Sequence, residues 1–465
     1  MSLDRRALLR HAAGLGAMTL IPGPLLGLAR CSVRRDGVAP DVRHAGVGEG
    51  GYGDLVPSRE CLELALPRDF RVVRLSVSGE RMSDGVATPG GFDGMAAFPL
   101  RNGHVRLVRN HELFTPRLLG DVAKAYDVIG GGGTTSLEVR VGGDGTVEKV
   151  RDFVSLGGTV LNCAGGPTPW RTWLSCEETV DGQRAGWQRA HGYVFEVPAD
   201  AEVQAEARPL PAMGRFVHEA AAVDPATGVV YLTEDMTVDS ARDRLGAGFY
   251  RFVPRVPAQL SEGGRLQALG IEGKARYQTY HGQHVGAALP VVWVDVPDSD
   301  PADAETDVSA VLRQAVAAGA AVFKRLEGCW YGFGRVFFTA ASGGDAGRGQ
   351  VWQYRSRGGD RGELTLIFES PVAGVVHGPD KPDNITVSPR GTGLLVCEDN
   401  GHRVHLRGIT PDGSVFDFAR NLADTREFAG VCFSPDGETL FVNIQGTVRP
   451  SATYAIGGPW QRGAL

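Results

Sequence analysis

Three pairs of residues with acidic or thiol side chains recur at one spacing in this chain. Carboxylates gathered in one cleft cannot all ionise unless cations compensate them, because like charges a few ångströms apart raise each other's pKa. A repeated spacing of such residues therefore predicts a cation site. The pairs, each fifteen residues apart, are Cys163 with Glu178, Glu219 with Glu234, and Asp383 with Glu398.

The residue types indicate which cations would bind. Carboxylate and amide oxygens are the ligands of hard cations such as Ca²⁺. Cys163 adds a soft thiolate, which suits a transition metal. The alternative for Cys163 is a small buried core residue, but its place between Asn162 and Ala164 at a matching repeat position favours a ligand. Cys176 and Cys397 instead stand inside apolar strand sequences and are predicted to be core residues.

Arg325 comes two residues before Glu327 and could reach the same cleft. A guanidinium beside a metal cluster would clamp a phosphate or another oxyanion. The alternative is an exposed arginine at the end of a helix. His111 and His218 precede Glu112 and Glu219, and packing or support of a ligand is favoured over direct ligation for both.

Six repeats of one unit must position these residues. Each unit has a polar start, a short apolar strand, a turn rich in proline or glycine, a second apolar strand and a polar end. Such a hairpin brings its first and last residues side by side. Six hairpins around an axis predict a six-bladed β-propeller with Cys163, Glu219, Glu234, Glu327, Asp383 and Glu398 at one mouth of its channel. The units span residues 93–112, 162–178, 218–235, 327–343, 383–399 and 429–445.

Six unrelated surface hairpins are the alternative, but independent surface acids have no reason to recur at hairpin ends. The repeat lapses between Thr237 and Lys324, where residues 249–252 and 291–294 are predicted strands and residues 307–323 a helix. We therefore predict the all-β class: one propeller domain over residues 45–465 with an inserted helical segment at about 237–324.

The amino-acid composition is consistent with many turns and limits the classes of molecule that the protein is expected to bind. The 465 residues include 65 glycines, about twice the usual share. Lys and Arg number 48 against 54 Asp and Glu, and no basic stripe is present, which argues against nucleic acid or an anionic membrane as the main partner. Small molecules are the expected partners, and a monomer is the default state.

The N-terminal region predicts export. Arg5-Arg6 are followed by an apolar run over residues 12–29, which Pro22 and Pro24 interrupt. This is typical of a twin-arginine signal, here residues 1–31, and the run is short for a membrane span. An ordinary N-terminal helix is the alternative. The expected location is periplasmic or extracellular, reached through the twin-arginine translocation machinery.

Seven motifs in order resemble one family, the secreted PhoX-type alkaline phosphatases of bacteria. The resemblance implies a six-bladed propeller, exported by the twin-arginine route, which holds iron(III) and calcium and hydrolyses phosphate monoesters. The motifs are Asn162-Cys163-Ala164-Gly165-Gly166 with Trp170, Ser175-Cys176-Glu177-Glu178, Arg215-Phe216 with His218-Glu219, Thr233-Glu234-Asp235, Arg325 with Glu327-Gly328, Pro382-Asp383-Asn384 with Cys397-Glu398-Asp399, and residues 428–445.

The resemblance also implies roles for residues. Arg325 is similar to the phosphate-binding arginine of the family, and we group it with Cys163 and Glu219 as the catalytic set. The implied metal ligands are Cys163, Glu178, Glu219 and Glu327 for the iron and calcium cluster, and Asp383, Asn384, Glu398 and Asp399 on its calcium side.

The leading prediction is a metal-dependent phosphomonoesterase, since no serine or threonine stands out as a nucleophile. A calcium-dependent lactonase or esterase propeller is the second possibility, and Cys163 discriminates against it because calcium has no use for a thiolate. A non-catalytic, calcium-stabilised binding propeller is the third, because one fold hosts many functions.

Overall fold

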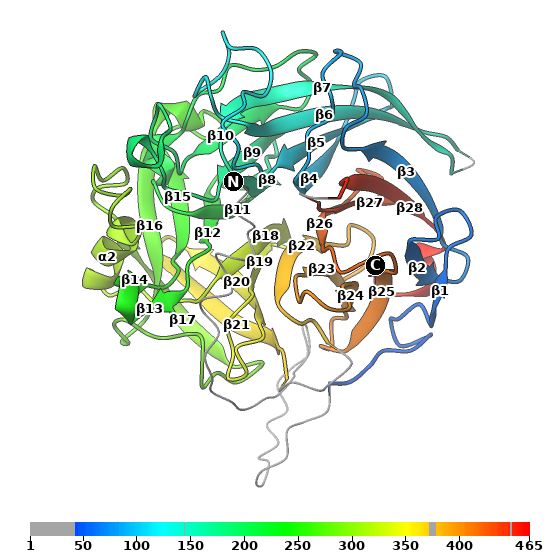
Figure 1. Ribbon diagram of the computed structural model, residues 1–465. Helices are drawn as coiled ribbons and strands as arrows, with labels where there is room; N and C mark the ends of the chain where they lie inside the picture. Colours follow the sequence, from blue (N-terminus) through cyan, green and yellow to red (C-terminus); the bar gives the residue numbers. More distant parts are fainter. Residues whose placement is uncertain (1–41, 144, 372–377, 447–448) are drawn as a thin grey trace, which may run out of the picture.

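A computed structural model describes residues 42–143, 145–371, 378–446 and 449–465. The predicted export signal at 1–31 lies outside these residues. The chain is almost entirely β, as predicted, and its strands form sheets arranged around a central axis (Figure 1).

The first three blades follow one another along the chain. Blade 1 contains β4 (Phe92–Pro99), β5 (Val105–His111), β6 (Gly132–Val141) and β7 (Val147–Thr159). Blade 2 contains β8 (Asn162–Pro167), β9 (Thr172–Glu177) and β10 (Val194–Pro198). Blade 3 contains β11 (His218–Val223), β12 (Val230–Glu234), β15 (Phe249–Pro254) and β16 (Gly264–Ile271), and β17 (Ala288–Asp295) links its outer edge to the next blade.

The other three blades complete the circle. Blade 4 contains β18 (Leu326–Gly332), β19 (Arg335–Ala340), β20 (Gln350–Gly358) and β21 (Arg361–Glu369). Blade 5 contains β22 (Pro382–Val387), β23 (Leu394–Glu398), β24 (His405–Ile409) and β25 (Val415–Asn421), with β2 (Leu64–Pro67) and β1 (Leu55–Pro57) added outside. Blade 6 contains β26 (Phe428–Phe433), β27 (Thr439–Ile444), β28 (Ala452–Gly457) and β3 (Arg71–Val77).

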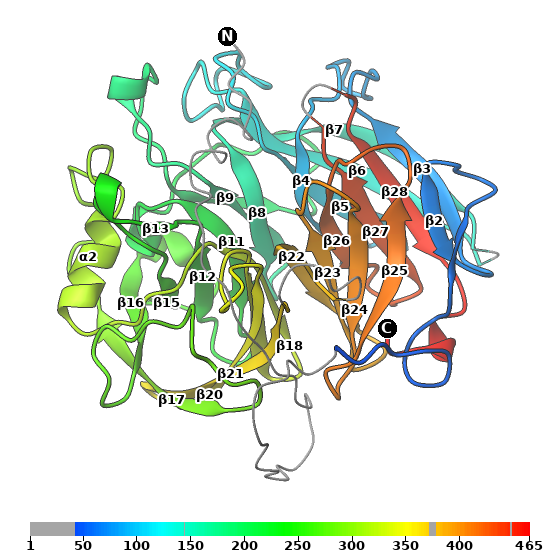
Figure 2. The same ribbon diagram turned by 60° about the horizontal axis from the view of Figure 1, so that its bottom comes forward.

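The innermost strands form a closed ring. Strands β4, β8, β11, β18, β22 and β26 each contact the next one, and β26 contacts β4 (Figures 1 and 2). The N-terminal strand β3 pairs antiparallel with β28 and so joins the two ends of the circle within blade 6. The predicted six-bladed propeller is confirmed, and its six inner hairpins are the six predicted repeats.

The core lies between adjacent blades. The inner strands are buried along most of their length, as in the sequence His218-Glu-Ala-Ala-Ala-Val223 of β11. Small or apolar residues suit these positions because a sheet covers each face. Between blades 5 and 6, for example, Leu395, Phe418, Val431 and Leu440 pack in one apolar cluster. Each such side chain contributes about 1.5–3 kcal/mol of burial free energy.

Residues 237–324 contain strands as well as the helix. The strands predicted at 249–252 and 291–294 lie in β15 and β17. A short ribbon, β13 (Val238–Asp239) with β14 (Arg244–Leu245), precedes them. The helix α2 (Ala310–Ala317) is shorter than predicted and buries Val311, Leu312 and Ala315. It ends before Gly319, whose φ of 102° is incompatible with a continuing helix.

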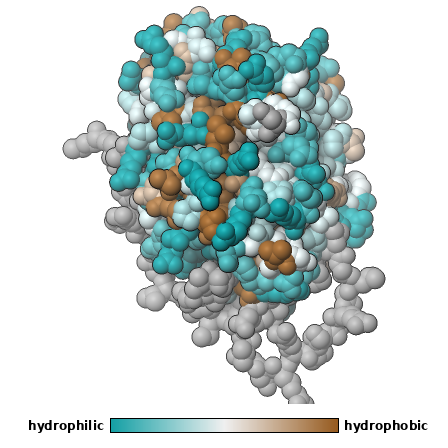
Figure 3. All heavy atoms as spheres, turned by 90° about the vertical axis from the view of Figure 1, so that its right-hand side faces the viewer, coloured by the Kyte–Doolittle hydropathy of each residue, from teal (hydrophilic) through white to brown (hydrophobic). Residues whose placement is uncertain are grey.

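No helix within the described part of the chain is long and apolar enough to cross a membrane. Figure 3 shows the edge of the molecule around β1–β3 as mainly hydrophilic, with hydrophobic residues in separate small areas. Scattered surface hydrophobics of this kind are normal for a folded protein.

Candidate metal centre

All six inner strands carry the same irregularity at the same place. Directly after its first residue or two, each loses register with the second strand of its hairpin, and the register resumes with one extra residue on the inner strand. Such β-bulges re-aim side chains. In five blades the second residue of the inner strand carries a carboxylate or a thiol. These residues are Asp93, Cys163, Glu219, Glu327 and Asp383, and the sixth blade has Ala429.

The bulged residues meet at one mouth of the channel. Their ligand atoms fall into three groups, and within each group all atoms lie within 4.8 Å of one another. Cys163 and Glu219 each belong to two groups, so the groups form a continuous arc across five blades. We call this set the acidic arc. The groups are Asp93 with Glu112 and Cys163, Cys163 with Glu178 and Glu219, and Glu219 with Glu327 and Asp383.

The residue that follows the second strand of each hairpin is the other source of side chains at this mouth. We call these six the post-strand residues. Glu112 and Glu178 supply carboxylates to the arc. In blade 6 the same position holds Gln445, whose amide nitrogen donates to Glu112 over 2.7 Å and also to Asp93. The full set is Glu112, Glu178, Asp235, Ala341, Asp399 and Gln445.

Cys163 lies at the centre of the arc. Its Sγ atom is 3.1 Å from Oε1 of Glu219 and 3.6 Å from Oδ2 of Asp93, and the side chain is fully buried. Burial raises the pKa of the Cys163 thiol well above its ordinary value, and Asp93 and Glu219 raise it further. An apolar core position would not surround the thiol with carboxylates. This arrangement suits a thiolate whose charge a metal compensates.

Two carboxylates of the arc have an oxygen without a hydrogen-bond partner among the described residues. These atoms are Oε2 of Glu219 and Oε2 of Glu327, both completely buried. Burial raises the pKa of Glu219 well above its usual range, and Glu327 and Glu178 add to this. Burial also raises the pKa of Glu327, although Arg325 opposes the shift. Orphaned buried oxygens are costly unless they bind a cation, so the donor set fits a cluster of hard cations plus one metal that accepts sulfur.

Arg325 borders the acidic arc next to Glu327. Its Nη2 atom lies 2.6 Å from Oε1 of Glu327 and 2.9 Å from Oδ2 of Asp235, while Nε is 3.0 Å from Oδ1 of Asp235. The two carboxylates fix the plane of the guanidinium, whose side chain is only 13% exposed. The predicted alternative, an exposed arginine after a helix, is therefore wrong.

Three predicted ligands do not belong to these three groups of thiol and carboxylate ligands, and one of the three, Asn384, is an amide that such groups do not include. Asn384 is buried beside Asp383, donates to its Oδ1 over 3.0 Å and accepts from the Gly430 N–H at 2.5 Å. Asp399 is half-buried, and its N–H donates to the carbonyl of Lys381. Glu398 is fully buried within blade 5, where the Nε of Arg407 is 3.0 Å from its Oε1.

Glu234 also points away from the mouth. It pairs with His218 as the last residue of β12, and its Oε2 accepts from the N–H of Gly248 and the hydroxyl of Tyr250, both at 2.8 Å. Burial raises the pKa of Glu234 to about 8. Because successive residues of a strand face opposite sides, Asp235 and not Glu234 faces the channel.

Asp93, Glu112, Asp235 and Gln445 are functional candidates that the sequence reasoning did not select. All four belong to the predicted hairpin units, so the signal was present. A comparison of all six hairpin ends, and not only of equal spacings, would have identified them.

Other sequence predictions concern packing and are confirmed. His111 is buried, with Nδ1 2.9 Å from the carbonyl of Gly90, and His218 stacks on Phe216 with a centroid distance of 3.6 Å. Cys176 and Cys397 are fully buried in apolar clusters.

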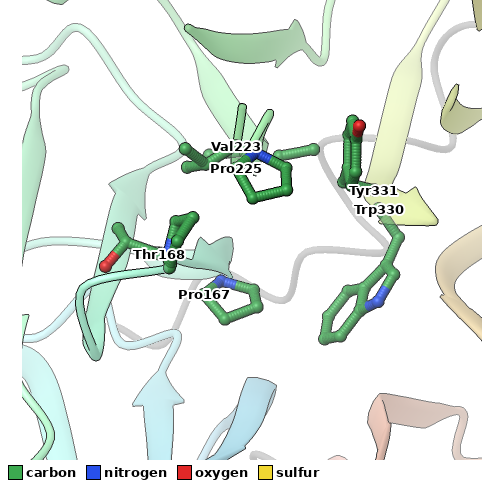
Figure 4. A pocket seen from close by; sticks show the side chains of 9 residues that line it. Pro167, Thr168, Val223, Pro225, Trp330 and Tyr331 are labelled. Atoms are coloured by element: carbon green, nitrogen blue, oxygen red, sulfur yellow. The ribbon is translucent and has the colours of Figure 1, made fainter. Parts of the chain in front are cut away.

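A cavity of about 240 Å³ lies at the opposite end of the inner strands. Figure 4 shows Pro167, Val223, Pro225 and the aromatic rings of Trp330 and Tyr331 around it. Trp330 also lines a much smaller space of about 20 Å³, formed mainly by the residues that follow the bulged ones in the inner strands, such as Gly94, Ala164, Ala220 and Gly328. It contacts three apolar clusters that belong to different blades. Trp330 thus separates the far opening of the channel from the arc.

Comparisons with known proteins agree with this geometry. The sequence matches the family of alkaline phosphatase PhoX over residues 50–152 and 141–447. Among solved structures, Pseudomonas fluorescens PhoX in complex with vanadate, a transition state analogue, superposes with a TM-score of 0.67 at 18% identity and covers 90% of this chain and 99% of its own. At that identity the superposition establishes the fold.

Weaker matches include a putative 6-phosphogluconolactonase from Bacteroides uniformis, with a TM-score of 0.36 at 12% identity over 78% of this chain and 83% of its own. A Trypanosoma rangeli sialidase matches with a TM-score of 0.35 at 11% identity, over 83% of this chain and 58% of its own. No curated protein matches the sequence.

Proposed function

The chain belongs to the alkaline phosphatase PhoX family, and on this premise we propose that it is a metal-dependent phosphatase that hydrolyses phosphate monoesters at the acidic arc. The observation that carries the proposal is the convergence of six carboxylates and the Cys163 thiol beside Arg325. Carboxylates alone would repel a phosphate dianion. An arc loaded with cations and bordered by a fixed guanidinium would bind it.

We assign the cations by donor chemistry. The soft Cys163 thiolate, with Glu178 and Glu219, would hold iron(III), and Glu219, Glu327 and Asp383 would complete the cluster with calcium. Asp93 and Glu112 offer a further oxygen-rich position. When bound, such cations withdraw charge from the phosphate oxygens and make phosphorus more electrophilic.

The side chains around the arc would perform the remaining tasks. Arg325, held in plane by Asp235, would orient the phosphate and stabilise the charge that develops on its oxygens. Trp330 would keep water from entering the arc through the far opening. Glu398 would act indirectly, since its Oε1 accepts from the N–H of Asp380 over 3.0 Å and so holds Asp380, two residues before β22.

The calcium-only lactonase alternative leaves Cys163 unexplained, because calcium does not use a thiol among buried carboxylates. We also propose that the twin-arginine signal at residues 1–31 directs export to the periplasm or the medium and that the protein acts as a monomer.

The decisive experiment combines turnover with metal analysis. Purified full-length protein should hydrolyse p-nitrophenyl phosphate at alkaline pH, lose activity after chelation and contain both iron and calcium by elemental analysis. Turnover of a lactone but not of p-nitrophenyl phosphate, with calcium and no iron, would favour the lactonase. If no ester is cleaved with any added metal between neutral and alkaline pH, the enzyme proposal fails.

A further inference from the structure

The residues that come directly before the inner strands form a ring at the mouth, which we call the pre-strand ring. In every blade the carbonyl of this residue accepts a hydrogen bond from the N–H of the post-strand residue, over 2.8 to 3.1 Å. The two positions are therefore equivalent in all six blades. The members of the pre-strand ring are Gly91, Leu161, Val217, Arg325, Lys381 and Glu427.

Leu161, Arg325 and Lys381 share an unusual backbone within this ring. Their φ angles are 50°, 50° and 51°, in the left-handed region that costs an L-residue about 1–2 kcal/mol. Gly91, at the same position in blade 1, has a φ of 59° without that cost. Equal backbone geometry at equivalent positions directs the side chains of Arg325 and Lys381 the same way relative to their blades. Because Leu161 has the same backbone, the left-handed conformation belongs to the ring position, and the case for Lys381 rests on the charge and the surroundings of its side chain.

The surroundings of the two side chains differ in one respect. Arg325 is tethered by Asp235, the post-strand residue of the preceding blade. The corresponding residue for Lys381 is Ala341, which has no carboxylate. Lys381 is exposed and forms no salt bridge with any residue in the described ranges. The neighbouring carboxylate of Asp380 feels the charge of Lys381 but pairs directly with Arg348, so the Lys381 ammonium can still bind a ligand.

The backbone that carries Lys381 is nevertheless firmly held. Its N–H donates to the carbonyl of Arg348 over 2.7 Å, and its carbonyl accepts from the N–H of Asp399. The preceding residue, Asp380, donates to Glu398 over 3.0 Å. A fixed backbone with a free cationic side chain is suited to binding an anion at a defined place.

We propose that Lys381 binds a second oxyanion of the substrate, a carboxylate or a further phosphate, next to the phosphoryl group that Arg325 holds. Blades 4 and 5 are neighbours in the ring, so one small molecule can contact both cations. Lys381 then selects phosphate esters that carry a second acidic group over those that do not. This inference rests on the proposed phosphatase function.

The test compares matched substrates in the complete, metal-loaded protein. Glycerol 3-phosphate and 3-phosphoglycerate differ by a carboxylate, and fructose 6-phosphate and fructose 1,6-bisphosphate by a phosphate. Lys381→Met should raise KM about three- to fivefold for the second member of a pair, as expected for an exposed ion pair, with kcat and the first member unchanged. Lys381→Arg should restore the wild-type KM. An effect on only one pair would identify which oxyanion is bound.

A binding measurement without turnover makes the inference independent of activity. In calorimetry, the wild-type protein should bind 3-phosphonopropionate several-fold tighter than methylphosphonate, and Lys381→Met should remove the difference. Arg255→Met is the charge-matched control, because Arg255 is exposed after β15 at the far end of blade 3. Equal affinities in the wild type, or an equal loss in both variants, would overturn the inference. Absence of ester hydrolysis in the wild type would refute the phosphatase function and leave the binding result to decide the role of Lys381.

Discussion

Nη2 of Arg325 lies 2.6 Å from Oε1 of Glu327, the residue two positions further along the chain. Arg325 lies directly before β18, and Glu327 lies at the bulge of that strand. A short stretch of backbone therefore places both a cation and a carboxylate at the mouth. Asp235 from the neighbouring blade holds the guanidinium from the other side. The proposed phosphate-binding cation and the proposed metal-binding carboxylate are thereby fixed relative to each other.

Arg325→Lys should lower kcat/KM for p-nitrophenyl phosphate by roughly a hundredfold, about 3 kcal/mol, because lysine keeps the charge but loses the planar fork. Asp235→Asn should cost less, about tenfold, since the guanidinium remains but is oriented by a weaker acceptor. Steady-state kinetics give both values, and thermal denaturation checks folding. If Arg325→Lys retained more than half of the wild-type kcat/KM, its assignment to the phosphate would be wrong.

Cys163→Ser should remove iron and the visible sulfur-to-iron absorption band while the propeller stays folded. Serine is a poorer donor whose proton is much harder to remove, whereas the carboxylates remain for calcium. Elemental analysis and absorption spectra measure the change. Cys176→Ser is the matched control: it should lower the free energy of unfolding by about 1–3 kcal/mol through a buried hydroxyl and keep the iron. If the Cys163→Ser variant retained its iron, Cys163 would be a core residue and not a metal ligand.

Glu234 should make stability depend on pH. Burial raises the pKa of Glu234 to about 8 from an ordinary value of 4.5, against the opposing hydrogen bonds of Gly248 and Tyr250. The folded protein therefore keeps a proton that the unfolded chain releases. The stabilisation that this proton contributes to the folded state is fully present below pH 4.5 and is lost as the pH rises to about 8.

Glu234→Gln imitates the protonated side chain and should remove this dependence. Relative to that of the wild type, the free energy of unfolding of the variant should increase progressively between these pH values, by up to ~5 kcal/mol. Urea denaturation at several pH values measures the difference, and the exposed Glu262→Gln serves as control. A constant difference across the range would contradict the raised pKa.

Trp330→Ala should open a route to the acidic arc from the far face. The indole forms a wall of both the 240 Å³ cavity and the small space under the arc, and its loss should also cost about 2–4 kcal/mol of stability. The metals should then leave faster when a chelator is added, at a temperature where both proteins are folded. Trp330→Phe should give an intermediate rate. Identical rates in all three proteins would show that chelators enter by the acidic mouth alone.

The hairpin repeat allowed the propeller and its mouth to be predicted, but not which of two adjacent acids faces the channel. Paired residues at the ends of the inner hairpin are fifteen apart in blade 2, Asn162 with Glu177, and sixteen apart in blade 3, His218 with Glu234. One extra residue moves a side chain to the other face of a strand. The equal spacings Cys163–Glu178 and Glu219–Glu234 therefore join residues that are not equivalent.

The bulges could not be predicted from the sequence either. A bulge inserts residues without changing composition or hydrophobic alternation in a recognisable way, and here it decides that Glu219 and Asp383 face the axis. The roles of Asp93 and Gln445 depend on the closure of blade 6 against blade 1, a contact between residues 352 positions apart.

The pairing of β28 with β3 fixes the order in which the molecule can be completed during synthesis. The strands that carry Cys163, Glu219, Glu327 and Asp383 are all made before β28 (Ala452–Gly457) exists. Until β26, β27 and Gln445 are also made, the inner strands can form only an open arc, in which Asp93 and Gln445 cannot meet. A cation bound by the growing chain would sit in an incomplete shell and exchange with solvent. Under the proposed function, the complete shell for the cations would therefore form only after the strands of blade 6 have been made.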